Sequence, residues 1–259
     1  MLVWRAACAG ARCETGRVTG ALPPLDIREL STAEGAHRAA AAFDEVWPGE
    51  RATMPANILR ALAHSGNYVV GVFDGETMIG AAAGFFGPPG TRSLHSHIAG
   101  VLPGYQGRGV GRALKAHQRT WALERGVGHI TWTFDPLVAR NAHFNLRVLG
   151  ARAVEYLVDH YGAMADDVNR GDATDRILVS WALAEPPAPT PAPEVVVASV
   201  AVPADIAALR REAPAEAATL RMAVRDELLL HLGAGLVIGG FDDELGYLLV
   251  AGETNTPSV

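Results

Sequence analysis

The chain has 259 residues, 49% of them apolar and 19% charged, and its formal charge is −6. This composition predicts a folded protein with a sizeable core, and the acidic balance excludes a broad nucleic-acid-binding surface, because such a surface needs clustered Lys and Arg. Only two cysteines are present, and no apolar stretch approaches the roughly 20 residues that cross a bilayer, so we expect a cytoplasmic protein without a disulfide framework or a membrane span.

Alternating or β-branched segments predict the strands of the first 183 residues. They lie at 25–29, 67–73, 77–86, 93–101, 129–134, 153–161 and 176–183. The second and third flank Asp74-Gly75, which favours a tight hairpin turn because glycine accepts a positive φ. We therefore expect these two strands to pair antiparallel.

Four helices are predicted between these strands. The first begins at Ser31, whose spacing to Glu34 is that of a capping box, and it ends near Trp47. A short second helix follows Pro55, and the fourth covers 141–149, where Gly150 stops it.

The third helix follows a glycine-rich turn and ends at Arg125-Gly126. Helical spacing predicts one apolar face, consisting of Val110, Ala113, Leu114, His117 and Trp121. The opposite face is predicted to be polar, with Arg112, Lys115 and Arg119.

The alternation of strands and helices predicts an α/β fold, in which helices cover both faces of a mixed sheet. Residues 1–24 lack periodicity and are expected to be poorly ordered, and 25–183 form the main domain. The proline-rich stretch 184–193 reads as a stiff linker. A small α+β extension follows at 194–255, which is marginal for independent folding, so we expect it to pack on the main domain or on a second subunit of a homodimer.

Four glycines crowd the stretch VLPGYQGRGVGRAL, from Val101 to Leu114. The spacing fits neither GxGxxG nor a P-loop, and it leaves Gln106-x-x-Gly109-x-Gly111 between a strand and a helix. Bare backbone N–H groups and the positive end of a helix can hold a diphosphate there. A glycine-rich turn without a ligand is the alternative.

The segment VLPGYQGRGVG resembles the coenzyme A pyrophosphate loop of the GNAT superfamily of N-acyltransferases. LHSHIAGVLPGYQGRGVGRALK, TWTFDPLVARNAHFNLRVLGA and NRGDATDRILVSW resemble a poorly characterised subgroup of predicted GNAT acyltransferases. The resemblance covers roughly residues 25–183 and implies a GNAT fold. It also implies acetyl-CoA or another acyl-CoA, with succinyl-CoA as one option, as the cofactor.

In this family the strands on either side of the loop splay apart, and the pantetheine arm of the cofactor pairs with the exposed backbone. The cofactor-binding residues that the resemblance implies are Gly100, Val101, Leu102, Gln106, Gly107, Arg108, Gly109, Val110, Gly111, Arg112, Asn141 and Asn145. The two arginines are equally consistent with solvated surface residues, and the two asparagines with turn or cap positions.

Attack of an amine on a thioester requires a base, because most aliphatic amines are protonated at pH 7. His95 and His97 lie two apart on one strand and share a face, and an imidazole suits this task near neutral pH. Packing is the alternative role for each of them. A His-x-His metal site would need a third ligand, and none lies at motif spacing, so we expect no metal.

Many family members carry a tyrosine acid four residues before the glycine that ends the last helix, and counting back from Gly150 gives Leu146 here. Tyr161 or water would then protonate the leaving thiolate. The sequence thus predicts an acyltransferase that acts on a primary amine of a small molecule, such as an amino acid. A non-catalytic CoA-binding or regulatory module is the alternative.

Overall fold

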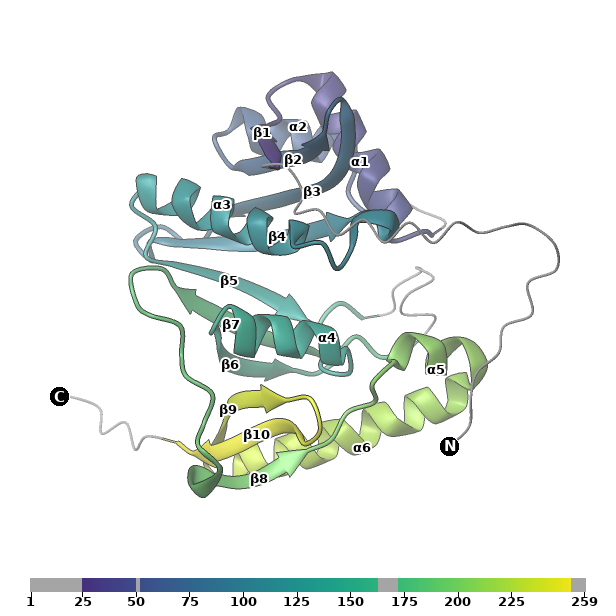
Figure 1. Cartoon of the computed structure of the whole chain (residues 1–259), viewed down its shortest axis with the longest axis vertical. Coiled ribbons are helices and arrows are strands. Elements are labelled where there is room, and N and C mark those ends of the chain that lie inside the picture. Colours follow the sequence, from purple (N-terminus) through teal and green to yellow (C-terminus); the bar gives the residue numbers. More distant parts are fainter. Residues whose placement is uncertain (1–24, 50–51, 163–171, 253–259) are drawn as a thin grey trace.

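The computed structural model describes residues 25–49, 52–162 and 172–252. The expectation for residues 1–24, which include both cysteines, lies outside these ranges. A seven-stranded sheet in the order β1-β2-β3-β4-β5-β7-β6 runs through the larger part of the molecule (Figure 1). Its strands are β1 (Asp26–Glu29), β2 (Tyr68–Asp74), β3 (Thr77–Phe86), β4 (Ser93–Val101), β5 (His129–Phe134), β6 (Arg152–Leu157) and β7 (Arg176–Ala182).

The sheet is mixed, as predicted. Among the described strands, β4 and β5 pair in parallel and the other ladders of this sheet are antiparallel. The β2–β3 hairpin turns at Gly75, whose φ of +59° needs a glycine-type conformation. Strand β6 ends at Leu157, four residues earlier than the predicted 161, because the chain turns at Asp159.

Helices cover both faces of the sheet. Helices α1 (Ala33–Val46) and α2 (Ala56–His64) pack on one face, and α3 (Val110–Glu124) lies on the other (Figure 1). The predicted capping box is wrong by one residue, because the side chain of Thr32, rather than Ser31, accepts from the Gly35 N–H at 3.0 Å.

The predicted helix at 141–149 begins earlier and is only partly α-helical. One turn of α-helix, α4 (Ala139–Ala142), continues into a π-helical segment (His143–Val148). A π-helix holds an extra residue per turn and therefore changes which side chains face the sheet.

The C-terminal extension has its own sheet in the order β8-β10-β9. Its strands are β8 (Val196–Val200), β9 (Leu236–Asp242) and β10 (Gly246–Ala251), and its helices are α5 (Ile206–Glu212) and α6 (Pro214–Gly233). Val224 and Leu228 of α6 belong to the same buried apolar cluster as Ile177 and Val179 of β7. The apolar stripe of α6 is therefore part of the core, and the extension packs on the main sheet.

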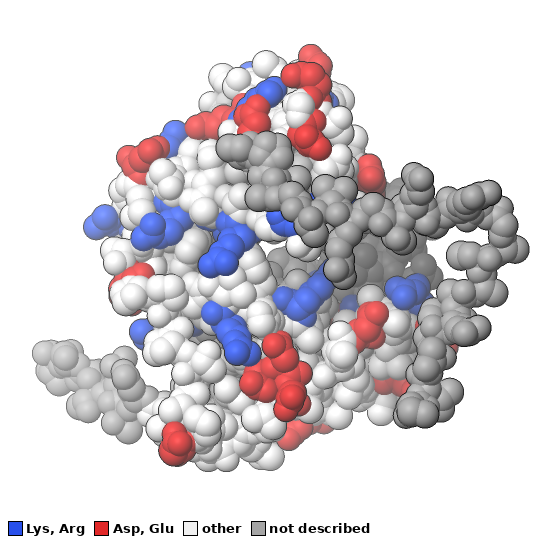
Figure 2. Space-filling view, viewed as in Figure 1, with Lys and Arg blue, Asp and Glu red and all other residues white. Residues whose placement is uncertain are grey.

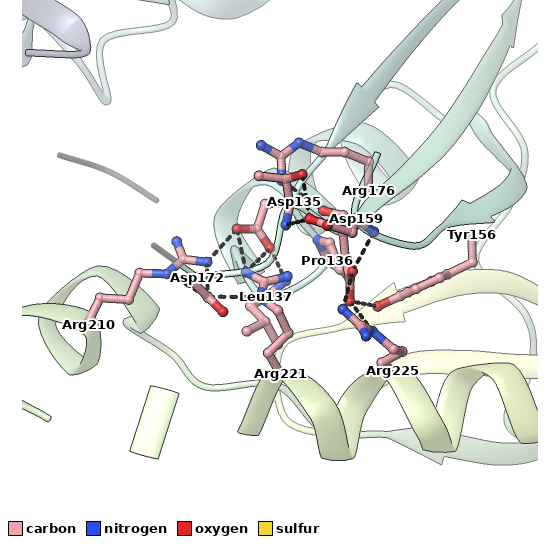
Figure 3. A network of polar contacts seen from close by, with 12 residues as sticks. Asp135, Pro136, Leu137, Tyr156, Asp159, Asp172, Arg176, Arg210, Arg221 and Arg225 are labelled. Carbon is pink, nitrogen blue, oxygen red and sulfur yellow. Dashed lines mark hydrogen bonds and ion pairs between the residues drawn. The ribbon is translucent and has the colours of Figure 1, made fainter. Parts of the chain in front are cut away.

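Buried ion pairs join the extension to the end of β5 (Figure 3). The carboxylate of Asp135 lies 2.6 Å from Arg210 of α5 and 3.0 Å from Arg221 of α6. Asp172 lies within 3.0 Å of Arg210 and 2.8 Å of Arg221. These four residues are the arginine–aspartate cluster.

Burial alone would raise the pKa of Asp135, but the charges of Arg221 and Arg210 outweigh it and hold that pKa below its usual range. Close by, Arg225 of α6 pairs with Asp175 at 2.6 Å, and the Tyr247 hydroxyl donates to the Pro136 carbonyl at 2.7 Å. The extension thus holds the chain that links β5 to α4. None of the described helices has the length and apolar character needed to cross a bilayer.

Candidate active site

Strands β4 and β5 separate part of the way along their length. Their ladder consists of Ser93–His129, Leu94–Ile130 and His95–Thr131, and it stops there. We call the following residues, 96–101 of β4 and 132–134 of β5, the wedge, and Figure 1 shows the two strands diverging in this direction. The backbone of β4 that faces β5 is therefore open to pairing with an extended ligand.

The glycine-rich turn lies at the open end of the wedge, between β4 and α3. Gly107 and Gly109 have φ values of +74° and +83°, so the turn itself requires glycine at both positions. Gly111 has no such φ, and a Cβ there would meet nothing within 4 Å. Neither the backbone conformation nor the packing therefore requires a glycine at 111, where alanine would favour the helix. The absence of a side chain leaves the first turn of α3 open to a close ligand.

The first N–H groups of α3 have no intrahelical acceptors and point out of the helix at this turn. Val110 is buried, so its side chain belongs to the core and its N–H is the group that a ligand could reach. Arg108 lies over the Tyr105 ring at 5.4 Å, and both Arg108 and Arg112 are exposed. Figure 2 shows Lys and Arg side chains gathered across the middle of the face that carries α3 and α4.

Three of the predicted residues hold the end of β4. The side-chain amide of Gln106 donates to the Val101 carbonyl at 2.9 Å, so this side chain fixes the turn to the strand. The Leu102 N–H donates to the Ile79 carbonyl at 2.9 Å. At Gly100 a Cβ would come within 2.9 Å of Trp47, so packing on α1 explains this glycine.

His95 and His97 share one face of the sheet, as predicted, and this is the face opposite α3. Their ring centroids are 6.2 Å apart, and each ring contacts Phe85. Between His95 and Ile98, β4 has one residue more than the facing part of β3, and the resulting bulge bends β4 close to the point where its ladder with β5 ends. We call this side of the wedge the histidine face.

The histidines are weaker bases than the sequence argument assumed. Burial, followed by the charges of His97, Lys115 and His160, lowers the pKa of His95 to about 4, and burial lowers the pKa of His97. The charges that act on His95 come from cationic groups. Both imidazoles are therefore neutral at pH 7 and able to accept a proton.

Two threonines of β5 extend the histidine face. Nδ1 of His95 lies 3.2 Å from Thr131 Oγ1, and the Tyr161 hydroxyl lies 3.0 Å from Thr133 Oγ1. The structure thus brings Tyr161 to the same face of the wedge as the histidines. Sequence reasoning missed the threonines, and the available signal was their position on either side of Trp132, because alternate residues of a strand point to opposite faces.

Lys115 is buried, so the prediction that it lies on a polar, exposed face is wrong. Its Nζ donates to Ser96 Oγ at 2.9 Å and to Gln118 Oε1 at 3.0 Å, and it lies 3.9 Å from the Trp132 ring centroid. The buried face of α3 is wider than the predicted apolar face, because it includes Lys115 and Gln118. Arg119 is half-buried, and its side chain donates to the Leu183 carbonyl.

The two asparagines differ in their surroundings. Asn145 is buried, and its Oδ1 accepts from Trp132 Nε1 at 3.2 Å, so it braces β5. Asn141 lies at the end of α4 and is half-buried. Leu146 is buried in the apolar core, so the side chain at the counted tyrosine position has no proton to donate. Within the described ranges, no group of three His, Cys, Asp or Glu side chains is placed to hold a metal.

Comparison with known proteins agrees with this geometry. Residues 34–151 match the model of the acetyltransferase (GNAT) family. N-alpha-acetyltransferase RimI of Mycobacterium tuberculosis is 35% identical over 98 residues, which are 38% of this chain and 61% of that protein. The chain thus matches less than two thirds of that curated relative's length.

Two solved structures share the fold. The protein yncA from Salmonella typhimurium, solved with its cofactor acetyl-CoA, gives a TM-score of 0.51 at 16% identity over 64% of this chain and 98% of that one. The ribosomal-protein-S18-alanine N-acetyltransferase from Escherichia coli gives 0.50 at 15% identity over 63% and 96%. The match to the acetyltransferase (GNAT) family model, over residues 34–151, contains both the wedge and the glycine-rich turn.

Proposed function

We propose that this protein is an acyl-CoA-dependent N-acyltransferase. The observation that carries the proposal is the break in the β4–β5 ladder after His95–Thr131, which leaves open backbone between the glycine-rich turn and the histidine face. One extended ligand can lie along this backbone with its diphosphate at the turn and its reactive end at the histidines. The proposal goes one step beyond the match of residues 34–151 to the GNAT family model, because it assigns a catalytic role to this chain.

The residues of the turn fit an acyl-CoA. Backbone N–H groups from Gly107 to Gly111 would hold the diphosphate, with the positive end of α3 behind them. Val101 and its neighbours on β4 would pair with pantetheine, and Arg108 and Arg112 are exposed near the turn for the remaining phosphate. The acyl thioester supplies the electrophilic carbonyl.

His97 is the residue that we assign first as the base, because it is exposed whereas His95 is half-buried and contacts Thr131. A base with a lowered pKa removes a proton more readily from an amine of low pKa. The α-amino group of a peptide has a pKa near 8, against about 10.4 for a lysine side chain. An α-amino group of this kind therefore fits the site better than a side-chain amine does, and the name of the M. tuberculosis relative also refers to an α-amino group.

The test is a screen for thiol release from acetyl-CoA and succinyl-CoA with amino acids and with polyamines as acceptors. We expect release with at least one amino-acid acceptor and the acylated amine as a product by mass spectrometry. Two acceptors that share one skeleton, with the amino group at the α position or at the chain end, test the preference for an α-amino group. Tight calorimetric binding of CoA without release from any donor would instead identify a CoA-binding module.

A further inference from the structure

One cationic side chain at the wedge has no ion-pair partner among residues 25–49, 52–162 and 172–252. Lys115 is 7% exposed, and its ammonium contacts neutral groups, the Ser96 hydroxyl, the Gln118 side chain and the Trp132 ring. A buried lysine without a carboxylate is costly, because the desolvation of its charge is not compensated. Such a residue calls for a role beyond packing.

Lys115 lies at the point where β4 and β5 begin to separate. Ser96 and Trp132 are the first residues of β4 and β5 after the last ladder pair, and Lys115 contacts both. Its Nζ therefore lies at the apex of the wedge on the α3 side. The imidazoles of His95 and His97 lie at the same level of β4 on the opposite side of the sheet.

We propose that Lys115 is the general acid that protonates the sulfur of coenzyme A as it leaves. The inference rests on the proposed function and concerns the same site. The acceptor binds after its ammonium has lost a proton to solvent, and the neutral nitrogen attacks the acyl carbon from the histidine face and gives one further proton to His97. The C–S bond then breaks with its electron pair on sulfur, and Lys115 transfers a proton from Nζ to that sulfur. The products are the amide and the free thiol, and solvent returns the proton from His97 to Lys115.

The arrangement separates the two proton transfers by the thickness of the sheet. A base on one face and an acid on the other suit a thioester that lies between them, because the nucleophile approaches the acyl carbon from one side and the leaving group departs from it in another direction. Burial lowers the pKa of Lys115 to about 7, so the amine can give up a proton in neutral solution and regain it. His95 is the titratable group that Lys115 affects from β4, and Gln118 and Trp132 beside it are neutral.

The other candidate acids are less well placed. Leu146 is apolar and buried. Tyr161 lies on the histidine face, where its hydroxyl contacts Thr133, so it is on the side from which the acceptor enters. This leaves Lys115 as the proton donor on the α3 side among the described residues that contact both strands at the apex.

The first test compares two acyl donors that lack the nucleotide and differ in the acidity of the leaving thiol, an N-acetylcysteamine thioester and a thiophenol ester. A more acidic thiol leaves without proton donation. Lys115→Met should therefore lower turnover of the alkyl thioester by roughly 10²-fold or more and that of the thiophenol ester by less than about threefold. Lys115→Gln, which keeps a hydrogen-bonding group, should show the same contrast.

Several outcomes would overturn the assignment. An equal loss with both donors means that Lys115 only supports the structure, and no loss means that it takes no part. A contrast that appears in Tyr161→Phe instead assigns the acid to Tyr161. A wild-type protein that releases thiol from no donor overturns the proposed function together with this inference.

The second test needs no turnover. The ultraviolet absorbance of the thiolate reports the ionisation of free CoA bound to the protein. A thiolate and an ammonium beside it stabilise each other, so the two groups titrate as a pair and the bound thiol should ionise at a lower pH in the wild type than in Lys115→Met. Equal thiol titrations, with CoA affinity preserved in both proteins, would place Lys115 away from the sulfur and overturn the proposal.

Discussion

The chain carries two groups of ionisable side chains at opposite ends of one short stretch, and they are built in opposite ways. In the arginine–aspartate cluster after β5, Asp135 and Asp172 each contact Arg210 and Arg221, so every charge is paired. At the wedge, the polar contacts of Lys115 and His95 are all with neutral groups, and none of the ion pairs among the described residues involves Lys115, His95 or His97. Trp132, which contacts Lys115, precedes Asp135 by only three residues.

The contrast distinguishes ionisable groups that stabilise the fold from those that could exchange protons during a reaction. A fully paired cluster shifts the pKa of Asp135 downwards and keeps it ionised, which suits a fixed joint between the main sheet and the extension. Burial lowers the pKa of Lys115 to about 7, into the range in which protons are exchanged in neutral solution, and it lowers the pKa of His95 to about 4, which leaves that imidazole neutral. Substitutions should therefore affect the first cluster mainly through stability and the second mainly through turnover.

The largest effect is expected from removal of the base. His97→Ala should lower turnover by roughly 10² to 10⁴ with CoA affinity preserved, because a general base contributes on this scale. If His95 is the base instead, the loss will follow His95→Ala. The exposed His37 of α1 provides a control, and His37→Ala should leave turnover unchanged. Wild-type turnover in both site variants would mean that water or another side chain removes the proton.

The pH profile adds a check on the same residue. Because the pKa of each histidine is lowered, the acid limb of kcat/KM should fall below the usual imidazole range, towards pH 4 if His95 is the base. An acid limb at the ordinary value near 6.5 would show that partial desolvation does not lower the pKa of the imidazole that acts as the base.

Breaking the paired cluster should cost stability. Asp135→Ala leaves Arg210 and Arg221 with less counter-charge in a buried position, so we expect the free energy of unfolding to fall by about 3–5 kcal/mol. Asp243 provides the matched control, since it joins His143 and Arg147 to the extension in an exposed ion pair. Asp243→Ala should cost less than about 1 kcal/mol. Equal losses in urea unfolding would show that burial does not distinguish the two sites.

The turn at the open end of the wedge can be tested at Gly111. Gly111→Val should weaken CoA binding by about 1.5–3 kcal/mol for each lost contact, because a branched side chain would fill the space in which the diphosphate approaches the backbone. Gly111 is a better site than Gly109, whose φ of +83° would add strain to any substitution. Gly233→Val in α6, where a Cβ also meets nothing, is the control for the helix effect. Unchanged calorimetric affinity of the folded Gly111→Val protein would reject the site.

The sequence predicted the sheet and the turn better than it predicted the apex of the wedge. Strand periodicity and the glycine spacing are local signals, and the structure has the β2–β3 hairpin and the α3 start where they indicated. The prediction for Lys115 was wrong because lysine was assigned to the polar face by its residue type. Its position next to Leu114, and three residues before Gln118, puts it beside the buried face of α3. The contacts of Asp135 with Arg210 and Arg221 join residues 75 and 86 positions apart, and no local pattern reports them.

The stability effect expected from Lys115→Met has the opposite sign to that of Asp135→Ala. The pKa of Lys115 is lowered from 10.5 to about 7, so between these pH values the unfolded chain binds more protons than the folded one, and the wild type loses stability as the pH falls. Met has a similar length and no charge, so Lys115→Met should be more stable than the wild type at pH 7. Its advantage should shrink by up to about 1.4 kcal/mol per pH unit as the pH rises towards 10. Urea unfolding of both proteins at pH 7, 8 and 9 measures this difference. A difference that does not change with pH would mean that the Lys115 ammonium is as well solvated in the fold as in the unfolded chain, and the contrast between the two clusters would then fail at its central residue.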